Sequence, residues 1–285
     1  MTDTSALRRL VPRITSRDHA ILADLHEHNV MTTHQIHRLH FPERCDRVVR
    51  HRMSRLHQYE LVDRFRPYSP RGRSPDHWVL SRLGGALVAA HRGGEAEPQD
   101  PAVRSDAIAL LAHSRQLGHK IGLVDCLVAF TTAARTTTSA QLVCWYGERE
   151  SARRWGRHIR PDAYVQWGQD GTTLHAFVEY DTGSEPLTKV RRKLPGYAWL
   201  AGESGLPSIV LFAVHSAARE NNLAVKAAED ASAEVGVYLT THHQLNHPGP
   251  AARIWRGTDG LGRLALLDIA RRHPVPEEGD RWSAS

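Results

Sequence analysis

Two acidic residues that share one face of an expected strand carry the clearest chemical signal in this sequence. Glu179 and Asp181 lie in the stretch 174–181, whose apolar and aromatic residues predict a strand. Side chains two positions apart on a strand point to the same face, so we expect these carboxylates side by side. Buried carboxylates repel each other, and a bound cation is the usual way to relieve that repulsion.

Two further acids are expected near the same place. Asp162 lies near the start of a predicted strand, 160–167, that pairs with 174–181, and Glu148 follows a predicted strand over 140–146. Carboxylate oxygens are ligands that suit Mg²⁺ or Mn²⁺. Such an ion can hold a scissile phosphate and generate hydroxide for attack on it. The four acids are therefore candidate metal ligands.

Lysine is rare enough in this chain for each one to be informative. Only four of the 37 basic residues are lysines, and Lys189 and Lys193 lie one helical turn apart on a helix expected over 186–200. An alternative interpretation leaves the acids exposed at strand ends, with ordinary salt-bridge partners in Arg191, Arg192 and Lys193.

The remaining elements of residues 105–240 must position these acids. Helical and strand periodicities predict two helices, three strands, a helix, a strand, a helix and a final strand. The predicted segments are 105–117, 121–135, 140–146, 160–167, 174–181, 186–200 (kinked at Pro195), 209–214, 217–233 and 235–240. The second and third strands are joined by a hairpin turn at 169–171. This order predicts an α/β domain over 105–270 with a mixed central sheet. The secondary structure of residues 242–270 is not predicted, but their apolar residues are expected to pack against the rest of the domain.

Charge is distributed unevenly along the chain. The formal net charge is +6, but residues 1–92 hold 16 arginines and 9 acidic residues, a net +7, and the rest of the chain is at −1. A basic segment beside a neutral one indicates a polyanion partner for the basic part. The alternative is a soluble basic domain with no such partner.

The basic segment, 1–92, has the element order of a winged helix-turn-helix. Capping residues, apolar spacing and turn residues predict three helices, a hairpin and a closing helix. The predicted segments are helices over 16–28, 33–39 and 43–59, strands over 61–66 and 77–80, and a helix that begins after Ser81. In such a module the third helix enters the major groove of DNA and the wing touches the phosphate backbone.

The third predicted helix is amphipathic, with a cationic exposed face. Val49, Met53 and Leu56 share its apolar face. The candidate contacts to double-stranded DNA, on this helix and at the tip of the hairpin, are Arg44, Arg47, Arg50, His51, Arg52, Arg55, Arg71 and Arg73. The alternatives are that the module binds protein, or that the arginines form a solvated face.

Composition excludes several other classes of protein. No apolar run reaches the roughly 18–20 residues of a membrane helix, and the first residues lack the apolar segment of a secretory signal. Three cysteines without a CxxC pair argue against a disulfide framework and a cysteine zinc site. We therefore expect a cytoplasmic protein. Residues 93–104 have the composition of a linker, and 271–285 that of a disordered tail.

The carboxylate pattern resembles the PD-(D/E)xK nuclease superfamily. Pro161-Asp162, a hairpin, then Glu179-x-Asp181 followed by a helix and a strand match the order of its core. The resemblance implies that Asp162 and Glu179 bind metal, and that a lysine two residues after the Glu assists. Here Asp181 stands at that position, so Lys189 or Lys193 would serve as a relocated lysine.

The whole layout resembles the replication-relaxation family of actinobacterial plasmids and mobile elements. The likeness is carried by Ser54-Arg55-Leu56, the stretches 78–84 and 177–185, Arg160-Pro161-Asp162, and Lys193-Leu194 through Tyr197. The resemblance implies a winged helix-turn-helix joined to a degenerate nuclease-like domain that acts on plasmid or mobile-element DNA.

Two functions follow from these observations. The first is a metal-dependent DNA endonuclease, with Asp162, Glu179 and Asp181 holding Mg²⁺ and Lys189 or Lys193 assisting. The second is a non-catalytic DNA-binding accessory or regulator, whose nuclease-like domain serves DNA grip, homodimerisation or a partner protein. The preserved acids favour the first, and the missing lysine after Glu179 favours the second.

Overall fold

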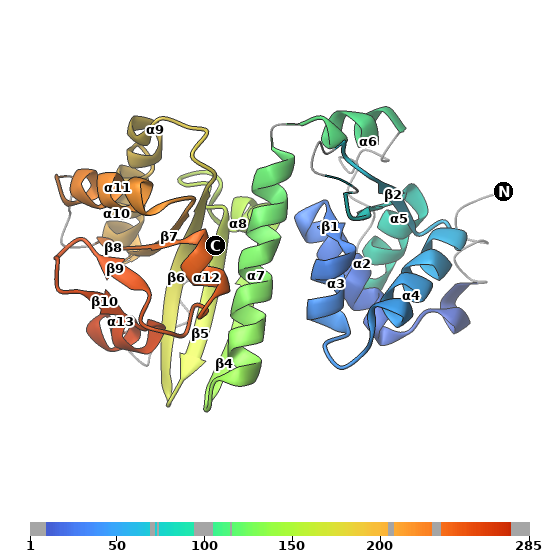
Figure 1. The fold of residues 1–285 in the computed structure, drawn as a ribbon, viewed down its shortest axis with the longest axis horizontal. Helices are drawn as coiled ribbons and strands as arrows, with labels where there is room; N and C mark the ends of the chain where they lie inside the picture. The colour runs from blue at the N-terminus through green and yellow to red at the C-terminus, as the bar shows by residue number, and fades with distance from the viewer. Residues whose placement is uncertain are drawn as a thin grey trace. The chain divides into compact units, whose positions relative to one another are not determined.

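The computed structural model divides the chain into two compact units, Met1–Val124 and Asp125–Ser285 (Figure 1). It describes residues 10–68, 72, 74–93, 105–114, 116–204, 208–229 and 235–274. The expected linker beyond residue 93, the expected tail from residue 275, and Arg71 and Arg73 lie outside these residues. The division between the units falls within helix α7 (Leu117–Thr136), later in the chain than the expected linker.

The first unit combines helices with a small antiparallel sheet of strand order β1-β3-β2. Its elements are the 3-10 helix η1 (Val11–Arg13), α2 (Ser16–His28), β1 (Met31–Thr32), α3 (Thr33–His40), α4 (Asp46–Gln58), β2 (Val62–Phe65), β3 (His77–Leu80), α5 (Arg82–His91) and α6 (Ser105–Ala112). The predicted order of three helices, a hairpin and a closing helix is therefore present, and β1 is an additional strand. The third predicted helix begins at Asp46 rather than at Glu43.

Local sequence explains where these helices begin. The hydroxyls of Thr15, Thr32 and Ser81 each accept a backbone hydrogen bond from the third residue of the helix that follows. α2 and α3 complete a capping box, because the side chains of Asp18 and Gln35 accept hydrogen bonds from the cap backbone.

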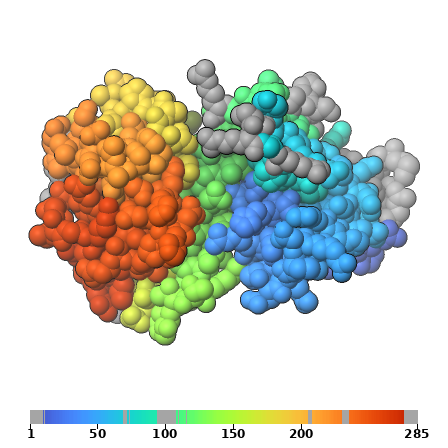
Figure 2. Space-filling model, viewed as in Figure 1, coloured from blue at the N-terminus to red at the C-terminus, as the bar shows by residue number. Residues whose placement is uncertain are grey.

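The second unit is built on a seven-stranded mixed sheet of order β10-β9-β8-β7-β6-β5-β4, which confirms the predicted α/β class. β6, β7 and β8 are parallel neighbours, and the other pairs are antiparallel. Its strands are β4 (Ala140–Tyr146), β5 (Ala163–Gln169), β6 (Thr172–Asp181), β7 (Ser208–Val214), β8 (Val235–Thr241), β9 (Trp255–Gly257) and β10 (Arg263–Leu264). Its helices, apart from its share of α7, are α8 (Glu148–Trp155), α9 (Leu187–Arg191), α10 (Leu194–Ser204), α11 (Ala217–Glu229), α12 (His242–Asn246) and α13 (Leu266–Arg272). In the space-filling view the orange and red atoms of the last part of this unit form one continuous surface (Figure 2).

Turn chemistry sets the register of the β5–β6 hairpin. Asp170 and Gly171 connect the strands, with φ angles of 48° and 73°. Two-residue hairpin turns of this hand need positive φ at both positions, which Asp and Gly tolerate. The resulting register pairs Ala163 with Val178, so Asp162 lies beside Glu179 at the end of the ladder.

Each face of the large sheet is covered by its own apolar side chains. On one face, residues of α8, α10 and α11 pack against Phe177, Val210 and Phe212 of the central strands. On the other, Phe130 of α7 contacts the rings of Trp167 and Trp255. Alternation along each strand thus separates two sets of side chains.

Several predicted boundaries are corrected by the structure. The helix expected over 186–200 is two helices, α9 and α10, because the chain turns at Arg192 and Lys193 and α10 then begins with Pro195 in its first turn. The unassigned stretch 242–270 forms α12, β9, β10 and most of α13, and its apolar residues Trp255, Leu266 and Ile269 are fully buried.

α7 is long and apolar enough, by length and composition alone, to cross a membrane, contrary to the sequence-based expectation. More than half of the most apolar part of this helix is buried inside the protein, and the side chains of Cys126 and Phe130 are fully buried. Such burial is typical of the core helix of a globular unit.

Candidate functional site

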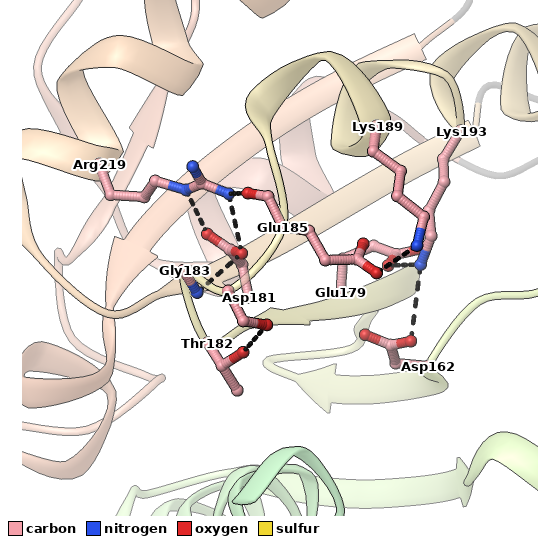
Figure 3. Close-up of polar contacts among 10 residues, drawn as sticks. Asp162, Glu179, Asp181, Thr182, Gly183, Glu185, Lys189, Lys193 and Arg219 are labelled. Carbon is pink, nitrogen blue, oxygen red and sulfur yellow. Dashed lines mark hydrogen bonds and ion pairs between the residues drawn. The ribbon is translucent and has the colours of Figure 1, made fainter. Parts of the chain in front are cut away.

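Lys193 joins two of the predicted acids into a cluster at the end of the β5–β6 hairpin (Figure 3). Its Nζ donates to Oε2 of Glu179 and lies 3.5 Å from Oδ1 of Asp162. Tyr197, one helical turn after Lys193 on α10, donates its hydroxyl to Oε1 of Glu179 at 2.5 Å. We call Asp162, Glu179 and Lys193 the acid–lysine cluster.

The backbone fixes the position of both acids in this cluster. Glu179 lies near the C-terminal end of β6, opposite Phe212 of β7 and just beyond the ladder with β5, and its side chain is almost fully buried. Oδ2 of Asp162 accepts a hydrogen bond from the backbone N–H of Tyr180 at 2.8 Å, which holds the carboxylate at the edge of the ladder. Glu148, the first residue of α8, has a carboxylate oxygen within 4.8 Å of one from Asp162.

Burial makes Glu179 chemically unusual. Burial raises the pKa of its carboxyl to about 8, and the neighbouring Asp162 charge acts in the same direction. The hydrogen bonds from Lys193 and Tyr197 oppose this rise. For Lys193, burial would lower the pKa, but the two carboxylates outweigh it and raise the pKa, so the lysine stays protonated. The site therefore holds a buried carboxyl that ionises near neutral pH beside a permanent positive charge.

Asp181 lies on the same face as Glu179, as the strand spacing predicts, but contacts different partners. Its carboxylate accepts hydrogen bonds from Nε and Nη2 of Arg219 on α11, at 2.6 and 3.1 Å, and from the backbone N–H of Gly183 (Figure 3). This two-point pairing uses both oxygens of Asp181.

Lys189 is likewise outside the cluster. Its ammonium pairs with Glu185 one helical turn earlier, and both side chains are exposed. Of the two lysines offered by the sequence, Lys193 is the one that contacts the acids. Tyr197 and Arg219 had no predicted role. The spacing of four residues between Lys193 and Tyr197, both inside the helix predicted over 186–200, is a signal that could have identified Tyr197.

The donor set of this region suits a hard divalent cation. Glu148 and Asp162 place carboxylate oxygens within 4.8 Å of each other, and Lys193 links Asp162 to the carboxylate of Glu179. Carboxylate oxygens are the ligands that Mg²⁺ and Mn²⁺ prefer. A buried carboxyl with a raised pKa is also a group that a cation would convert to its charged form.

The predicted basic face of α4 is exposed in the first unit. Val49, Met53 and Leu56 are fully buried. Arg47, His51 and Arg55, spaced four residues apart, are all exposed and form what we call the α4 stripe. Arg55 also contacts the Tyr59 ring and donates to its hydroxyl at 2.8 Å. The stripe thus presents basic groups along more than two helical turns.

Other predicted DNA contacts have different surroundings. Arg44 is exposed but precedes α4, and Arg50 pairs with Asp46 at 3.1 Å. Arg52 is the clearest exception, because its guanidinium pairs with Asp18, a carboxylate only 1% exposed. Burial would raise the pKa of Asp18, but hydrogen bonds from Arg52 and Thr15 outweigh it and lower the pKa. Arg52 therefore ties α4 to α2.

Comparison with known proteins places the chain in a family. No curated protein sequence matches it. A family model described as Replication-relaxation matches residues 22–207, more than half of the chain, and this range includes both the α4 stripe and the acid–lysine cluster. The chain therefore belongs to the replication-relaxation family.

Proposed function

We propose that this protein binds double-stranded DNA through its first unit, acting as a winged helix-turn-helix, in the replication or relaxation of a plasmid or mobile element. Membership of the replication-relaxation family suggests a role in those processes. The observation that carries the proposal is the α4 stripe: three basic side chains at intervals of four residues, opposite a fully buried apolar face.

The chemistry of the stripe fits the phosphate backbone and the base edges of the major groove. Arginine can donate to phosphate oxygens or, with two bonds, to guanine. An α-helix fits the width of that groove, and the net charge of +7 over residues 1–92 would steer the protein toward DNA.

The test is a binding titration of the full chain with a labelled duplex. The double variant Arg47→Gln and Arg55→Gln removes two positive charges from the stripe without touching its buried face. Arg92→Gln, at the exposed end of α5, is the matched control. The proposal expects the double variant to bind at least about tenfold more weakly and the control to bind normally, since each phosphate or base contact contributes roughly 1 kcal/mol or more. Equal affinity of all three proteins would refute it.

A second candidate function is cleavage of a phosphodiester bond in the second unit. The observation that favours it is the acid–lysine cluster, in which the ammonium of Lys193 contacts the carboxylates of both Asp162 and Glu179. This is the arrangement that a PD-(D/E)xK-like nuclease with a relocated lysine would need. Glu148, Asp162 and Glu179 would hold Mg²⁺ or Mn²⁺, and the ion would supply charge stabilisation and an activated water.

The residues of the cluster also support the non-catalytic alternative. With Glu179 protonated below about pH 8, the ammonium of Lys193 balances the charge of Asp162 and also contacts Glu179, so the two acids have a partner without a metal ion. Asp181 and Lys189 do not enter the proposed site, since Arg219 and Glu185 are their partners.

Incubation of the protein with supercoiled plasmid and Mg²⁺ or Mn²⁺ separates the two candidates. A nuclease nicks the plasmid and loses this activity in Asp162→Asn and Glu179→Gln. Arg271→Gln, at an exposed position on α13, serves as the control and keeps it. If the wild-type protein leaves the plasmid intact with either metal, the protein is a non-catalytic DNA-binding accessory.

A further inference from the structure

An exposed aromatic pair lies on the second unit, next to the acid–lysine cluster. Trp199 of α10 is 45% exposed, which is unusual for the largest apolar side chain in a folded unit. Its ring stacks on His158, with ring centroids 4.1 Å apart and the planes inclined by 23°. This stacking restricts both side chains and leaves the tryptophan open to solvent.

Close packing of α10 on the segment before β5 creates this pair. Gly196 allows the approach, because a Cβ at that position would lie 2.7 Å from Cγ2 of Ile159. Ile159 is buried between His158 and Arg160, so the two neighbours point to the exterior and are exposed. One turn of α10 after Gly196, Trp199 meets His158.

Three exposed arginines lie close in the chain to this pair or to Lys193, and they have no acidic partner among the residues that the structure describes. Arg157 and Arg160 flank His158, and Arg192 directly precedes Lys193. All three are exposed, in contrast to Arg153, Arg154 and Arg191 nearby, which pair with glutamates. We call Arg157, His158, Arg160, Arg192 and Trp199 the Trp199 surface.

This surface adjoins the acid–lysine cluster through the chain itself. Arg160 is two residues before Asp162, and Arg192 is next to Lys193, whose Nζ contacts both acids. Short chain segments therefore join this surface to the two acids.

We infer that the Trp199 surface binds single-stranded DNA, with a base stacked on Trp199 and phosphates paired with Arg157, Arg160 and Arg192. Stacking needs an open base face, and in a duplex the neighbouring bases occupy those faces. An exposed aromatic platform within a cationic surface is the combination by which proteins hold single strands without sequence preference. The inference rests on the proposed action on DNA and names the form of DNA that the second unit takes.

The test measures binding of the full-length protein to a dye-labelled oligo-dT of about 16 nucleotides, the upper end of single-strand site sizes. We expect Trp199→Ala to weaken binding by about tenfold, because one base–aromatic stack typically contributes a factor of this order or more. Trp199→Phe keeps an aromatic face and is expected to retain most of the affinity. The apolar control is Leu261→Ala, at another exposed position of the same unit.

A second variant keeps the test decisive if the aromatic change alters folding. Arg157→Gln with Arg160→Gln leaves every ring in place. It is expected to reduce the slope of log affinity against log salt by about 1.4, the value for two lost phosphate contacts to a single strand. Circular dichroism of each variant checks that the fold is kept.

The outcomes separate this inference from the proposed duplex binding. Loss of oligo-dT binding in the Trp199 and arginine variants, with duplex affinity unchanged, supports the inference. Unchanged oligo-dT binding in both variants overturns it, even where the α4 variant has lost duplex binding. A parallel titration with oligo-rU distinguishes DNA from RNA, and preference for the RNA strand would contradict the assignment to DNA.

Discussion

Lys193 is the side chain that most affects what the second unit can do. It provides a positive charge at the point where two acids meet, although it lies fourteen residues after Glu179 in the chain. Lys193 lies in the turn between α9 and α10, slightly before the kink that was predicted at Pro195. The sequence identified Lys193, Asp162 and Glu179 as candidate site residues. It did not distinguish Lys193 from Lys189 as the assisting lysine, or Glu179 from Asp181 as a metal ligand.

The raised pKa of Glu179 leads to a prediction about proton release. If Mg²⁺ binds at Glu148, Asp162 and Glu179, it must displace the proton that Glu179 holds below about pH 8. Metal affinity should therefore rise as pH rises toward 8 and level off above that value. Calorimetry near pH 7, in two buffers of different ionisation enthalpy, should detect release of close to one proton per ion bound.

The matched variant for this prediction is Glu179→Gln. It keeps the size of the side chain and removes its titration, so it should bind Mg²⁺ more weakly and with little proton release. Identical metal affinity at pH values on either side of 8 in the wild-type protein would contradict the role given to Glu179.

Arg52 and Arg47 form a matched pair on one helix for a stability prediction. Arg52→Ala leaves the buried carboxylate of Asp18 without its guanidinium partner, so unfolding free energy should fall by about 3 kcal/mol. Arg47→Ala changes an exposed side chain and should alter it by no more than about 0.5 kcal/mol. Urea unfolding of the two variants measures both values. Equal stability would mean that Arg52 is a surface residue available to DNA.

At the level of helices and strands, the sequence predicted most elements where a local signal was strong. The helices predicted to begin at residues 16 and 33 and after Ser81, and the hairpin turn at Asp170-Gly171, are all present. The strands β1, β9 and β10 were not predicted, because two or three residues contain no periodicity. Their positions depend on tertiary pairing, as in the antiparallel contact of β9 with β8.

Two glycines on α10 test how this helix is positioned. Gly196 packs against Ile159, so Gly196→Ala should destabilise the protein by about 1–3 kcal/mol through overpacking. Gly202 has open space where a Cβ would stand, so Gly202→Ala should stabilise the helix by about 0.5–1 kcal/mol. Thermal unfolding of the two variants should therefore give shifts of opposite sign. Shifts of the same sign would mean that α10 does not approach the segment before β5 as closely as described.

On the scale of the whole molecule, the net charge of +6 conceals two different units. Residues 1–92 hold more arginines than acids, whereas basic and acidic residues nearly balance in the remainder, where acids form specific pairs such as Asp181–Arg219 and Glu220–Arg263. Charge counting could locate the basic unit. It could not reveal which acids are neutralised, because that depends on strand register and on helices brought together by the fold.

The most direct test of the proposed function is the salt dependence of duplex DNA binding by the full-length protein. Phosphate contacts release counterions, so log affinity should fall linearly with log salt concentration, by about 0.9 for each contact. Replacing Arg47 and Arg55 with glutamine should reduce that slope by about 1.8, whereas Arg92→Gln should leave it unchanged. A duplex affinity that is insensitive to salt, or the same slope in the wild-type and double-variant proteins, would contradict the assignment of the α4 stripe to DNA.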